Sequence, residues 1–311
     1  MSGPVVGFLG PAGTFSEVAA GRLAGPWAEE LVPVESIVNL IQGLAEGTIH
    51  GSDQRIDAAV VPIENSTEGS VGATLDTLVE HENLVITAEL DLRIEQLLVA
   101  RRAIELADIE QIYSHPQGLA QTSRFVAEHL PKAGVVPVSS TSRSIELVVA
   151  SDEPWAAIGS RRAAELYGAV ILRDDVQEQV NVTRFVLIER RDAPVERAAA
   201  EAEAIVAAAA SPQRRAGDAE RAMKTTVVFQ GDGDGSPGWL VRCLSEFAFR
   251  SVNLTKIESR PLRGQLGHYR FFIDLEGAAT DPDPVEAITR LSGIASGVRI
   301  LGSYPVSADP V

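Results

Sequence analysis

The stretch VVGFLGPAGTFSE, residues 5–17, decides how the chain begins to fold. The apolar run Val5–Leu9 predicts a strand, and Gly10–Gly13 ends it in a turn. Thr14 and Glu17 have the spacing of a capping box, so a helix is expected from Phe15 onward. The free amides of that helix face the turn and favour an anion there.

The kind of anion can be narrowed from the turn itself. A nucleotide loop of the G-x-x-x-x-G-K-[ST] type needs a lysine, which residues 10–17 do not contain. The dinucleotide pattern G-x-G-x-x-G does not occur there either. We therefore expect a carboxylate rather than a phosphate at this turn.

The overall charge points away from polyanionic partners. The 311 residues include 43 acidic and 27 basic side chains, a formal charge of -16, which disfavours nucleic acid and anionic membrane surfaces. We expect no membrane span, since no run reaches the ~18 apolar residues required. The N-terminus does not resemble a signal peptide, so we expect a cytoplasmic protein.

Cysteine and histidine usage argues against a metal site. Cys243 is the single cysteine, which excludes an intrachain disulfide, and the five histidines lack the spacing of zinc ligands. We expect neither a metal nor another cofactor.

Strands and helices alternate up to about residue 190, which favours an open α/β sheet. Helical spacing is seen at Leu75, Leu78 and Val79. The predicted strands are 5–9, 58–63, 97–100, 111–114, 156–158 and 185–188. Residues 191–223 are rich in Ala, Glu and Arg and are interpreted as a linker.

The C-terminal part has a different pattern, βαββαβ, typical of a small ferredoxin-like sandwich. Thr225–Gln230 and the alternating Tyr269–Leu275 predict strands. A second helix is expected with Asp283 as N-cap, Pro284 at the first helical position and Glu286 three residues after the cap.

Three further polar stretches border predicted strands. They are VVPIENSTEGS (60–70), YSHPQGLAQ (113–121), in which Ser114 is expected to cap a helix, and NVTRFVLI (181–188). The carboxyl ends of strands form the usual ligand edge of an α/β sheet. Taken singly, each stretch also fits a purely structural turn, and His115 fits a structural histidine.

In combination these motifs closely resemble the prephenate dehydratase family. GPAGTFSE, VVPIENSTEGSV, YSHPQGLAQ and NVTRF occur in that order, and NLTKIESRP (253–261) resembles the ACT regulatory domain that follows the catalytic domain in this family. The resemblance implies a two-lobed α/β catalytic domain, 1–190, like a periplasmic binding protein. Its lobes would be about 3–80 with 180–190, and 81–179, and the ACT domain would be 224–306.

The resemblance also implies a reaction. Prephenate would lose carbon dioxide and water to give phenylpyruvate in phenylalanine biosynthesis. Thr183 would act as hydrogen-bond donor to the departing hydroxyl, and Glu64 could relay a proton to it. The expected catalytic residues are Thr183, Asn65, Ser114 and Gln121, which match family positions implicated in binding or turnover, together with Glu64 as a relay if it is buried and protonated. The expected substrate-binding residues are Thr14, Ser16, Ser66, His115, Asn181, Arg184 and Phe185.

For regulation, the resemblance implies that ACT domains pair in a homodimer or homotetramer and bind L-phenylalanine at their interface. The corresponding positions are Pro237, Gly238, Leu240, Asn253, Leu254, Glu258, Ser259 and Arg260. Two positions depart from the family pattern: Gln96 stands where histidine is usual, and Trp239 replaces alanine. Arogenate dehydratase, and a sensor that binds a small carboxylate without turnover, are the alternative functions.

Overall fold

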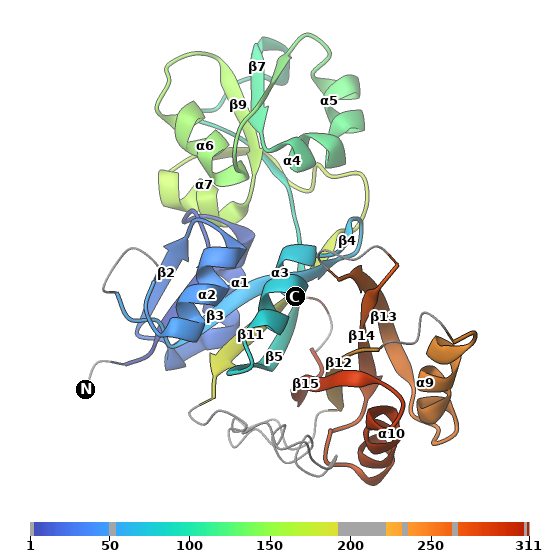
Figure 1. Cartoon of the computed structure of the whole chain (residues 1–311). Coiled ribbons are helices and arrows are strands. Elements are labelled where there is room, and N and C mark those ends of the chain that lie inside the picture. The colour runs from blue at the N-terminus through green and yellow to red at the C-terminus, as the bar shows by residue number, and fades with distance from the viewer. Residues whose placement is uncertain are drawn as a thin grey trace.

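A computed structural model describes residues 3–49, 54–191, 222–231, 236–262, 267–307 and 310. The predicted linker, 191–223, lies almost entirely outside these residues. Figure 1 shows three compact parts: a first lobe that contains the N-terminus, a second lobe above it, and a C-terminal unit beside the first lobe.

A ten-stranded sheet runs through the first lobe and the C-terminal unit in the order β13-β14-β12-β15-β5-β11-β3-β1-β2, with β4 paired to β3. In the first lobe β1, β2 and β3 are parallel, whereas β11 is antiparallel to both β3 and β5. The first-lobe strands are β1 Val5–Leu9, β2 Glu30–Val34, β3 Ala58–Asn65, β4 Gly69–Ser70, β5 Leu84–Arg93 and β11 Val182–Arg190.

Helices cover both faces of the first-lobe sheet. Helix α1 (Phe15–Ala24) packs on one face with Val6, Phe8 and Phe185. Helices α2 (Ile37–Glu46) and α3 (Gly72–Glu80) cover the other face. A 3-10 turn, η1 (Gly25–Trp27), follows α1.

The second lobe contains a five-stranded sheet in the order β10-β6-β9-β7-β8, also covered on both faces. Its elements are β6 Leu97–Ala100, η2 Leu106–Asp108, β7 Gln111–Ser114, α4 Pro116–Gln121, α5 Ser123–His129, β8 Gly134–Pro137, α6 Thr141–Val149, β9 Trp155–Gly159, α7 Arg161–Tyr167 and β10 Val170–Arg173. The two-lobed α/β fold of the periplasmic-binding-protein type is thus confirmed.

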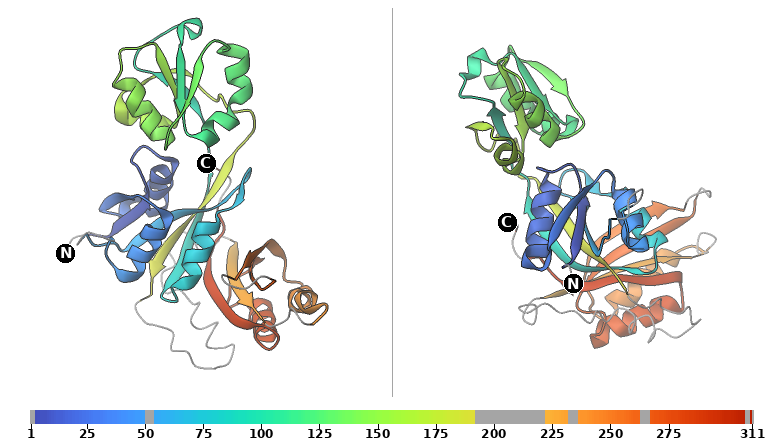
Figure 2. Two further views of the ribbon diagram at one scale, coloured as in Figure 1. Left: turned by 45° about the horizontal axis from the view of Figure 1, so that its top comes forward. Right: turned by 90° about the vertical axis from the view of Figure 1, so that its left-hand side faces the viewer.

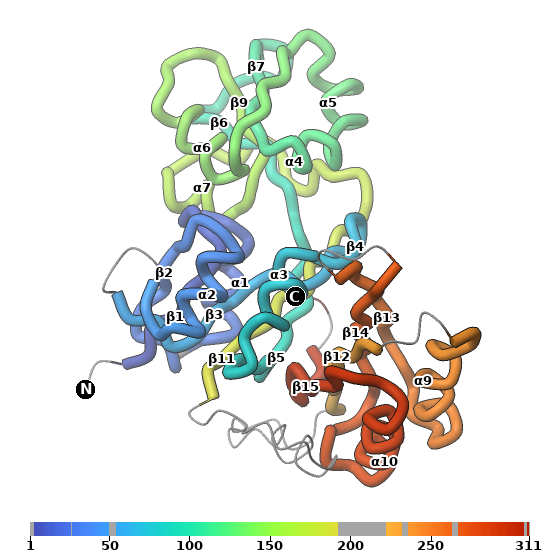
Figure 3. Tube along the Cα trace, in the orientation of Figure 1, coloured from blue at the N-terminus to red at the C-terminus, as the bar shows by residue number. Residues whose placement is uncertain are grey.

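Two segments connect the lobes, one after β5 and one before β11, and both can be followed in Figures 2 and 3. Because β5 pairs with β11 along its whole length, residues 84–93 belong to the first lobe. The predicted start of the second lobe at residue 81 is therefore wrong, and the chain crosses at 94–96.

The C-terminal unit has the predicted βαββαβ order. Its elements are β12 Met223–Gln230, α9 Trp239–Ala248, β13 Leu254–Pro261, β14 Tyr269–Glu276, α10 Pro282–Ser292 and β15 Ser296–Pro305. Helix α10 begins one Asp-Pro pair earlier than predicted, with Asp281 as N-cap and Pro282 at the first position. The repeated sequence DPDP offers two similar starts, and the first one is used.

This unit packs against the first lobe instead of standing apart from it. Val228, Phe272 and Tyr304 share a hydrophobic core with Leu84, Ile86 and other residues of the first lobe. Strand β15 meets β5 at Gly302 and Ile86. The Arg299 guanidinium donates to the carbonyl oxygens of Val79, His81 and Leu84, and burial lowers its pKa to about 10.

The described residues contain neither a membrane-spanning helix nor a cluster of metal ligands. Among the described residues, no helix is both long and apolar enough to span a membrane. In the same part of the chain, no three His, Cys, Asp or Glu side chains are grouped in a way that could hold a metal ion.

Candidate active site

A cavity of about 390 Å³ lies where the two lobes meet. Its wall is built from the turns that follow β1, β3, β7 and β8, and from the start of β11. The lining residues are Leu9, Gly10, Thr14, Phe15, Ser16, Ile37, Pro62, Asn65, Glu68, Val71, Ile94, Gln96, His115, Gln117, Gly118, Gln121, Ser139, Ser140, Thr141, Asn181, Thr183 and Phe185. All four sequence motifs therefore contribute to one cavity.

Helix N-termini from both lobes open onto this cavity. In the first lobe Thr14 caps α1, its Oγ1 accepting from Glu17 N at 3.4 Å. In the second lobe Ser140 caps α6, its Oγ accepting from Arg143 N at 3.0 Å. The free amides and dipoles of both helices favour a negatively charged ligand.

Glu17, the second residue of the predicted capping box at α1, bonds back to the N–H of Gly13, not to that of Thr14, and also contacts the second lobe. The Glu17 carboxylate accepts from Gly13 N at 2.5 Å and from Arg162 at 2.7 and 2.9 Å. The Ser160 Oγ donates to the Gly13 carbonyl at 2.5 Å. The turn after β1 therefore holds the lobes together beside the cavity.

Asn65 has all its hydrogen-bonding capacity satisfied within the protein. Its Oδ1 accepts from Thr67 N at 2.9 Å, Thr67 Oγ1 at 2.6 Å and Glu68 N at 3.1 Å. Backbone N–H groups can only donate, so these bonds fix the orientation of the amide. Its Nδ2 then donates to Asn181 Oδ1 at 2.7 Å and Thr183 Oγ1 at 2.8 Å.

The orientation of the Asn65 amide determines which hydrogen bonds Thr183 can make. Thr183 is 8% exposed on the cavity wall. Its hydroxyl oxygen accepts the Asn65 proton, so its own O–H proton is left to donate to a ligand. A neutral threonine is too weak an acid to transfer a free proton. It can, however, donate a directed hydrogen bond to a developing negative charge.

Other predicted side chains stand near Thr183 as donors. The Asn181 Oδ1 is occupied by Asn65, which leaves the Asn181 amide protons for the cavity. His115 Nδ1 accepts from Gln117 N at 3.3 Å, so the neutral ring carries its proton on Nε2. Ser16 in the first turn of α1 adds a hydroxyl to the cavity wall, and the ring of Phe185 adds an apolar surface.

Gln121 and Gln96 meet at the same wall. The Gln96 Nε2 donates to Gln121 Oε1 at 3.4 Å. The Gln96 Oε1 is buried and has no hydrogen-bond partner in the described part of the chain. A buried amide oxygen without a partner costs stability, which makes it a candidate acceptor for a bound ligand.

Two predicted residues point away from the cavity. Thr183 and Phe185 of β11 and Asn181 just before it line the cavity, and Arg184 lies on the opposite face, as strand alternation requires. There it contacts Asp91 at 2.8 and 2.9 Å and Glu64 at 3.4 Å. The prediction of substrate contacts for Arg184 and of a proton relay at Glu64 is not supported.

Those contacts keep the Arg184 guanidinium charged. Hydrogen bonds to Asp91 and the nearby carboxylates of Glu89 and Glu64 raise its pKa, against the opposing effect of burial.

Ser114 and Ser66 have structural contacts where substrate contacts were predicted. The Ser114 side chain is fully buried and its Oγ donates to the Ile158 carbonyl at 2.8 Å. His115, not Ser114, caps α4. Ser66 pairs with the backbone of Val182, its Oγ accepting from Val182 N at 3.0 Å.

The described wall contains neither lysine nor arginine. A dianionic ligand would therefore be held by helix N-termini and neutral donors. Adjacent to the cavity, a second space of about 320 Å³ is lined by Thr67, Glu68, Gln117, Gln121 and Asn181, among others, and shares several of these residues with it.

Comparison with known proteins identifies the family. The family described as "Prephenate dehydratase" matches residues 6–193. A prephenate dehydratase of Lactococcus lactis subsp. cremoris is 35% identical over 304 residues, 97% of each chain. The chain belongs to the prephenate dehydratase family. This family places the chain among the carbon–oxygen lyases.

Two solved structures extend the comparison. Prephenate dehydratase of Arthrobacter aurescens in complex with L-Phe is 37% identical, with a TM-score of 0.80, over 97% of this chain and 90% of that one. A protein described as GqqA, a novel type of quorum quenching acylase, is 28% identical with a TM-score of 0.79, over 97% and 98%. The similarity of this chain to a solved prephenate dehydratase thus extends over nearly its whole length.

The expected effector positions of this prephenate dehydratase family member lie at both ends of β13. Arg260 is opposite Arg270 in β14, as is Gln230 of β12, so Arg260 lies at the end of the sheet where α9 begins. Pro237, Gly238 and Leu240 are at the start of α9. Asn253 and Leu254 are at the other end, since Leu254 pairs with Leu275. One chain does not bring all eight together.

Trp239 fills the interior of the C-terminal unit. It is 8% exposed, makes tilted ring contacts with Phe229 and Phe271, and donates from Nε1 to the Ile294 carbonyl at 3.1 Å. The indole of Trp239 therefore occupies space in the core of the C-terminal unit.

Sequence reasoning missed several wall residues of this prephenate dehydratase family member, among them Ser139, Ser140 and Thr141. The signal was present, because two serines and a threonine follow an apolar run and precede a helical pattern. The short strand β8 before them was not predicted, so the turn was not recognised.

Proposed function

We propose that this chain converts prephenate to phenylpyruvate, carbon dioxide and water in the cavity between the lobes. The observation that carries the proposal is the hydrogen bond from Asn65 to Thr183, which leaves the threonine proton for the departing hydroxyl. A pure binding protein would have no need of a donor held in this way.

The two carboxylates of prephenate suit the two sides of the cavity. One would bind at the N-terminus of α1 near Ser16, and the other at the N-terminus of α6 near Ser140. Asn181 and His115 would add donors. The apolar wall formed by Ile94 and Phe185 would accept the ring.

The reaction then needs little further chemistry from the protein. The ring carboxylate leaves as carbon dioxide, and its bonding electrons form the aromatic ring as the C–O bond to the hydroxyl breaks. The departing hydroxide is stabilised by the Thr183 hydrogen bond and takes up the one proton that the net reaction consumes from the buffered solvent, so that prephenate dianion and one proton give phenylpyruvate monoanion, carbon dioxide and water. Neutral donors that are already in position account for this stabilisation.

The test is an assay of freshly prepared prephenate with the purified protein. We expect phenylpyruvate to form in proportion to enzyme concentration. Prephenate binding in calorimetry without any product would contradict the proposal and support a sensor.

Arogenate remains a second candidate substrate because of two acceptors at the wall. The Gln96 Oε1 is unpaired, and Glu68 also lines the cavity, so an ammonium group would find partners there. Side-by-side measurement of kcat/KM for prephenate and arogenate decides between them.

We also propose that the C-terminal unit is an ACT domain through which L-phenylalanine inhibits the enzyme. The proposal is supported by its βαββαβ order and by the similarity to the Arthrobacter enzyme in complex with L-Phe. Strand β13 lies at one end of the ten-stranded sheet, and an antiparallel pair of such edges would bring Asn253 and Leu254 of one copy toward Ser259 and Arg260 of the other.

This arrangement implies a homodimer or homotetramer. We expect phenylalanine to reduce the reaction rate and to stabilise the oligomer in sedimentation experiments. Unchanged kinetics at saturating phenylalanine would contradict the regulatory part of the proposal.

A further inference from the structure

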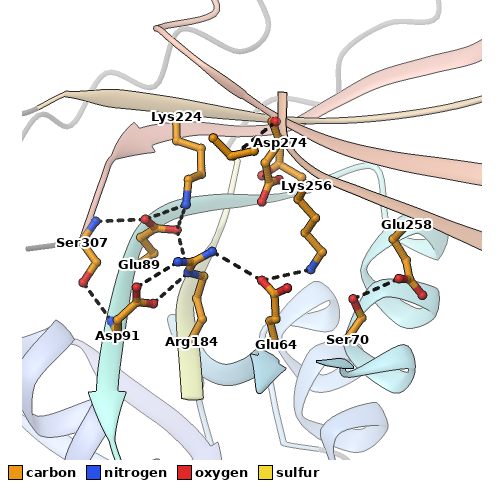
Figure 4. A network of polar contacts seen from close by, with 12 residues as sticks. Glu64, Ser70, Glu89, Asp91, Arg184, Lys224, Lys256, Glu258, Asp274 and Ser307 are labelled. Carbon is orange, nitrogen blue, oxygen red and sulfur yellow. Dashed lines mark hydrogen bonds and ion pairs between the residues drawn. The ribbon is translucent and has the colours of Figure 1, made fainter. Parts of the chain in front are cut away.

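A partly buried polar network joins strand β11 to the C-terminal unit (Figure 4). Its centre is Arg184, the neighbour of Thr183 in sequence. Three carboxylates surround the guanidinium: Asp91 at 2.8 and 2.9 Å, Glu64 at 3.4 Å and Glu89 at 3.5 Å.

Glu89 is the most deeply buried of the three carboxylates, with a side chain that is 0% exposed. Lys224 of β12 donates to its two oxygens at 2.8 and 2.9 Å, and Ser307 N donates at 2.9 Å. Both residues belong to the C-terminal unit or directly follow it. A buried carboxylate shared in this way is strongly destabilised when one of its cations is removed.

The other two carboxylate residues are also held from the C-terminal side. The backbone N–H of Asp91 donates to Ser307 Oγ at 2.8 Å. Lys256 of β13 lies 3.5 Å from Glu64. Each residue that contacts Arg184 thus has a second contact from the C-terminal unit or the residues after it (Figure 4).

The network lies next to the catalytic pair along two strands. In the β11–β3 pairing, Thr183 is opposite Asn65 and Arg184 is opposite Glu64. The register shifts between Arg184 and Phe185, so the pairing with β3 is interrupted just after the segment that carries Thr183. Because Arg184 directly follows Thr183 in β11, the contacts that hold the guanidinium also constrain the backbone that carries Thr183.

We propose that Lys224 and Glu89 are positioning residues, through which the C-terminal unit sets the place of Thr183 by way of Arg184. This inference rests on the proposed function. It adds a route by which the state of the C-terminal unit reaches the reacting groups without any contact with substrate.

The test replaces the cation in the otherwise intact chain. Lys224→Met should lower kcat about tenfold or more, while KM for prephenate changes less than about twofold, since small displacements of a catalytic group act on turnover. Lys224→Arg keeps a donor for Glu89 and should recover most of kcat. The control Asp76→Asn breaks another contact between the units, Asp76 with Arg260 at 2.7 Å, and should leave uninhibited kcat unchanged.

A second variant separates positioning from the cost of an unpaired charge. The double change Glu89→Gln with Lys224→Met removes both buried charges, so the protein should regain its thermal stability. We still expect reduced kcat, and we expect saturating phenylalanine to inhibit this variant less than wild type although phenylalanine still binds.

The outcomes separate the two proposals. Wild-type protein that forms no phenylpyruvate contradicts the proposed function. If the wild-type protein forms phenylpyruvate and the double variant has normal kcat and normal inhibition by phenylalanine, the proposed function stands and the positioning role is wrong.

Discussion

At the scale of single residues, the role proposed for Thr183 depends on the direction of one hydrogen bond. Asn65 cannot turn its amide, because its oxygen accepts from two backbone N–H groups and a hydroxyl. The Thr183 oxygen must therefore accept a hydrogen bond from Asn65, and the Thr183 hydroxyl proton remains available to a ligand in the cavity.

We expect Thr183→Val, which keeps the side-chain shape, to lower kcat by roughly 100- to 1000-fold, as loss of one oxyanion donor does. KM should change little, because the carboxylates bind elsewhere. Steady-state phenylpyruvate formation measures both constants. Thr183→Ser keeps the hydroxyl and should retain much of the activity; a Val variant with near-normal kcat would refute the assigned role.

A second prediction concerns Gln96, whose Oε1 is buried without a partner in the described structure. Gln96→Met removes that unpaired acceptor, so the free energy of unfolding should stay the same or rise. If the oxygen pairs with substrate, KM should rise about fivefold, the effect of a net hydrogen bond of ~1 kcal/mol. Thermal unfolding and kinetics on the same preparation test this, and an unchanged KM would show that Gln96 makes no substrate contact.

Much of the wall could be predicted from residue types, and the errors have a common cause. Motif letters placed Thr183, Asn181 and Asn65 at one site, where they lie. The same motifs also led to the prediction of site roles for Glu64 and Arg184, because a sequence motif does not show which face of a strand each side chain occupies. Only the pairing of β3 with β11 decides that.

At the scale of elements, one unpredicted strand, β5, has a pattern that depends on distant partners. Strand β5 carries Glu89 and Asp91, which are unusual in a buried strand. They are accommodated because Lys224 and Arg184 neutralise them, and neither cation is near in sequence. By contrast the predicted strand 5–9 is apolar and needs no such partner.

The turn between β1 and α1 yields a prediction at this scale. Gly13 has φ of +83°, and a Cβ there would lie 2.6 Å from Ser142 Oγ and 3.0 Å from Ala163 in the second lobe. Gly13→Ala should therefore push the lobes apart as well as strain the backbone, and KM for prephenate should rise about tenfold, corresponding to ~1.4 kcal/mol.

Gly168→Ala is the matched control. Gly168 has φ of +70° with open space around its Cβ position, so it carries the same strain without a contact between lobes. Both variants should lose ~1–2 kcal/mol of stability in denaturant unfolding. Equal KM values for the two variants would contradict the role of the turn in holding the lobes.

At the scale of the whole molecule, the C-terminal unit shares a core with the first lobe. The linker composition suggested an independent domain, yet Phe272 and Tyr304 pack with Ile86. The contact between β15 and β5 involves one residue pair, Gly302 with Ile86, more than 200 positions apart. No local pattern could have predicted it.

The same sheet leaves β13 as its outermost strand, and that edge predicts the assembly. Ile257 in β13 is 51% exposed, an unfavourable place for a large apolar side chain on a free edge unless another strand covers it. Ile257→Lys should therefore convert the oligomer to monomers and weaken phenylalanine inhibition, while uninhibited kcat falls less than about threefold.

Val135→Lys is the control, because Val135 is 49% exposed in β8, a strand at one edge of the five-stranded sheet. Sedimentation velocity of both variants should show dissociation for Ile257→Lys alone; an intact oligomer in that variant would place the interface elsewhere, since a lysine at a paired edge disfavours association.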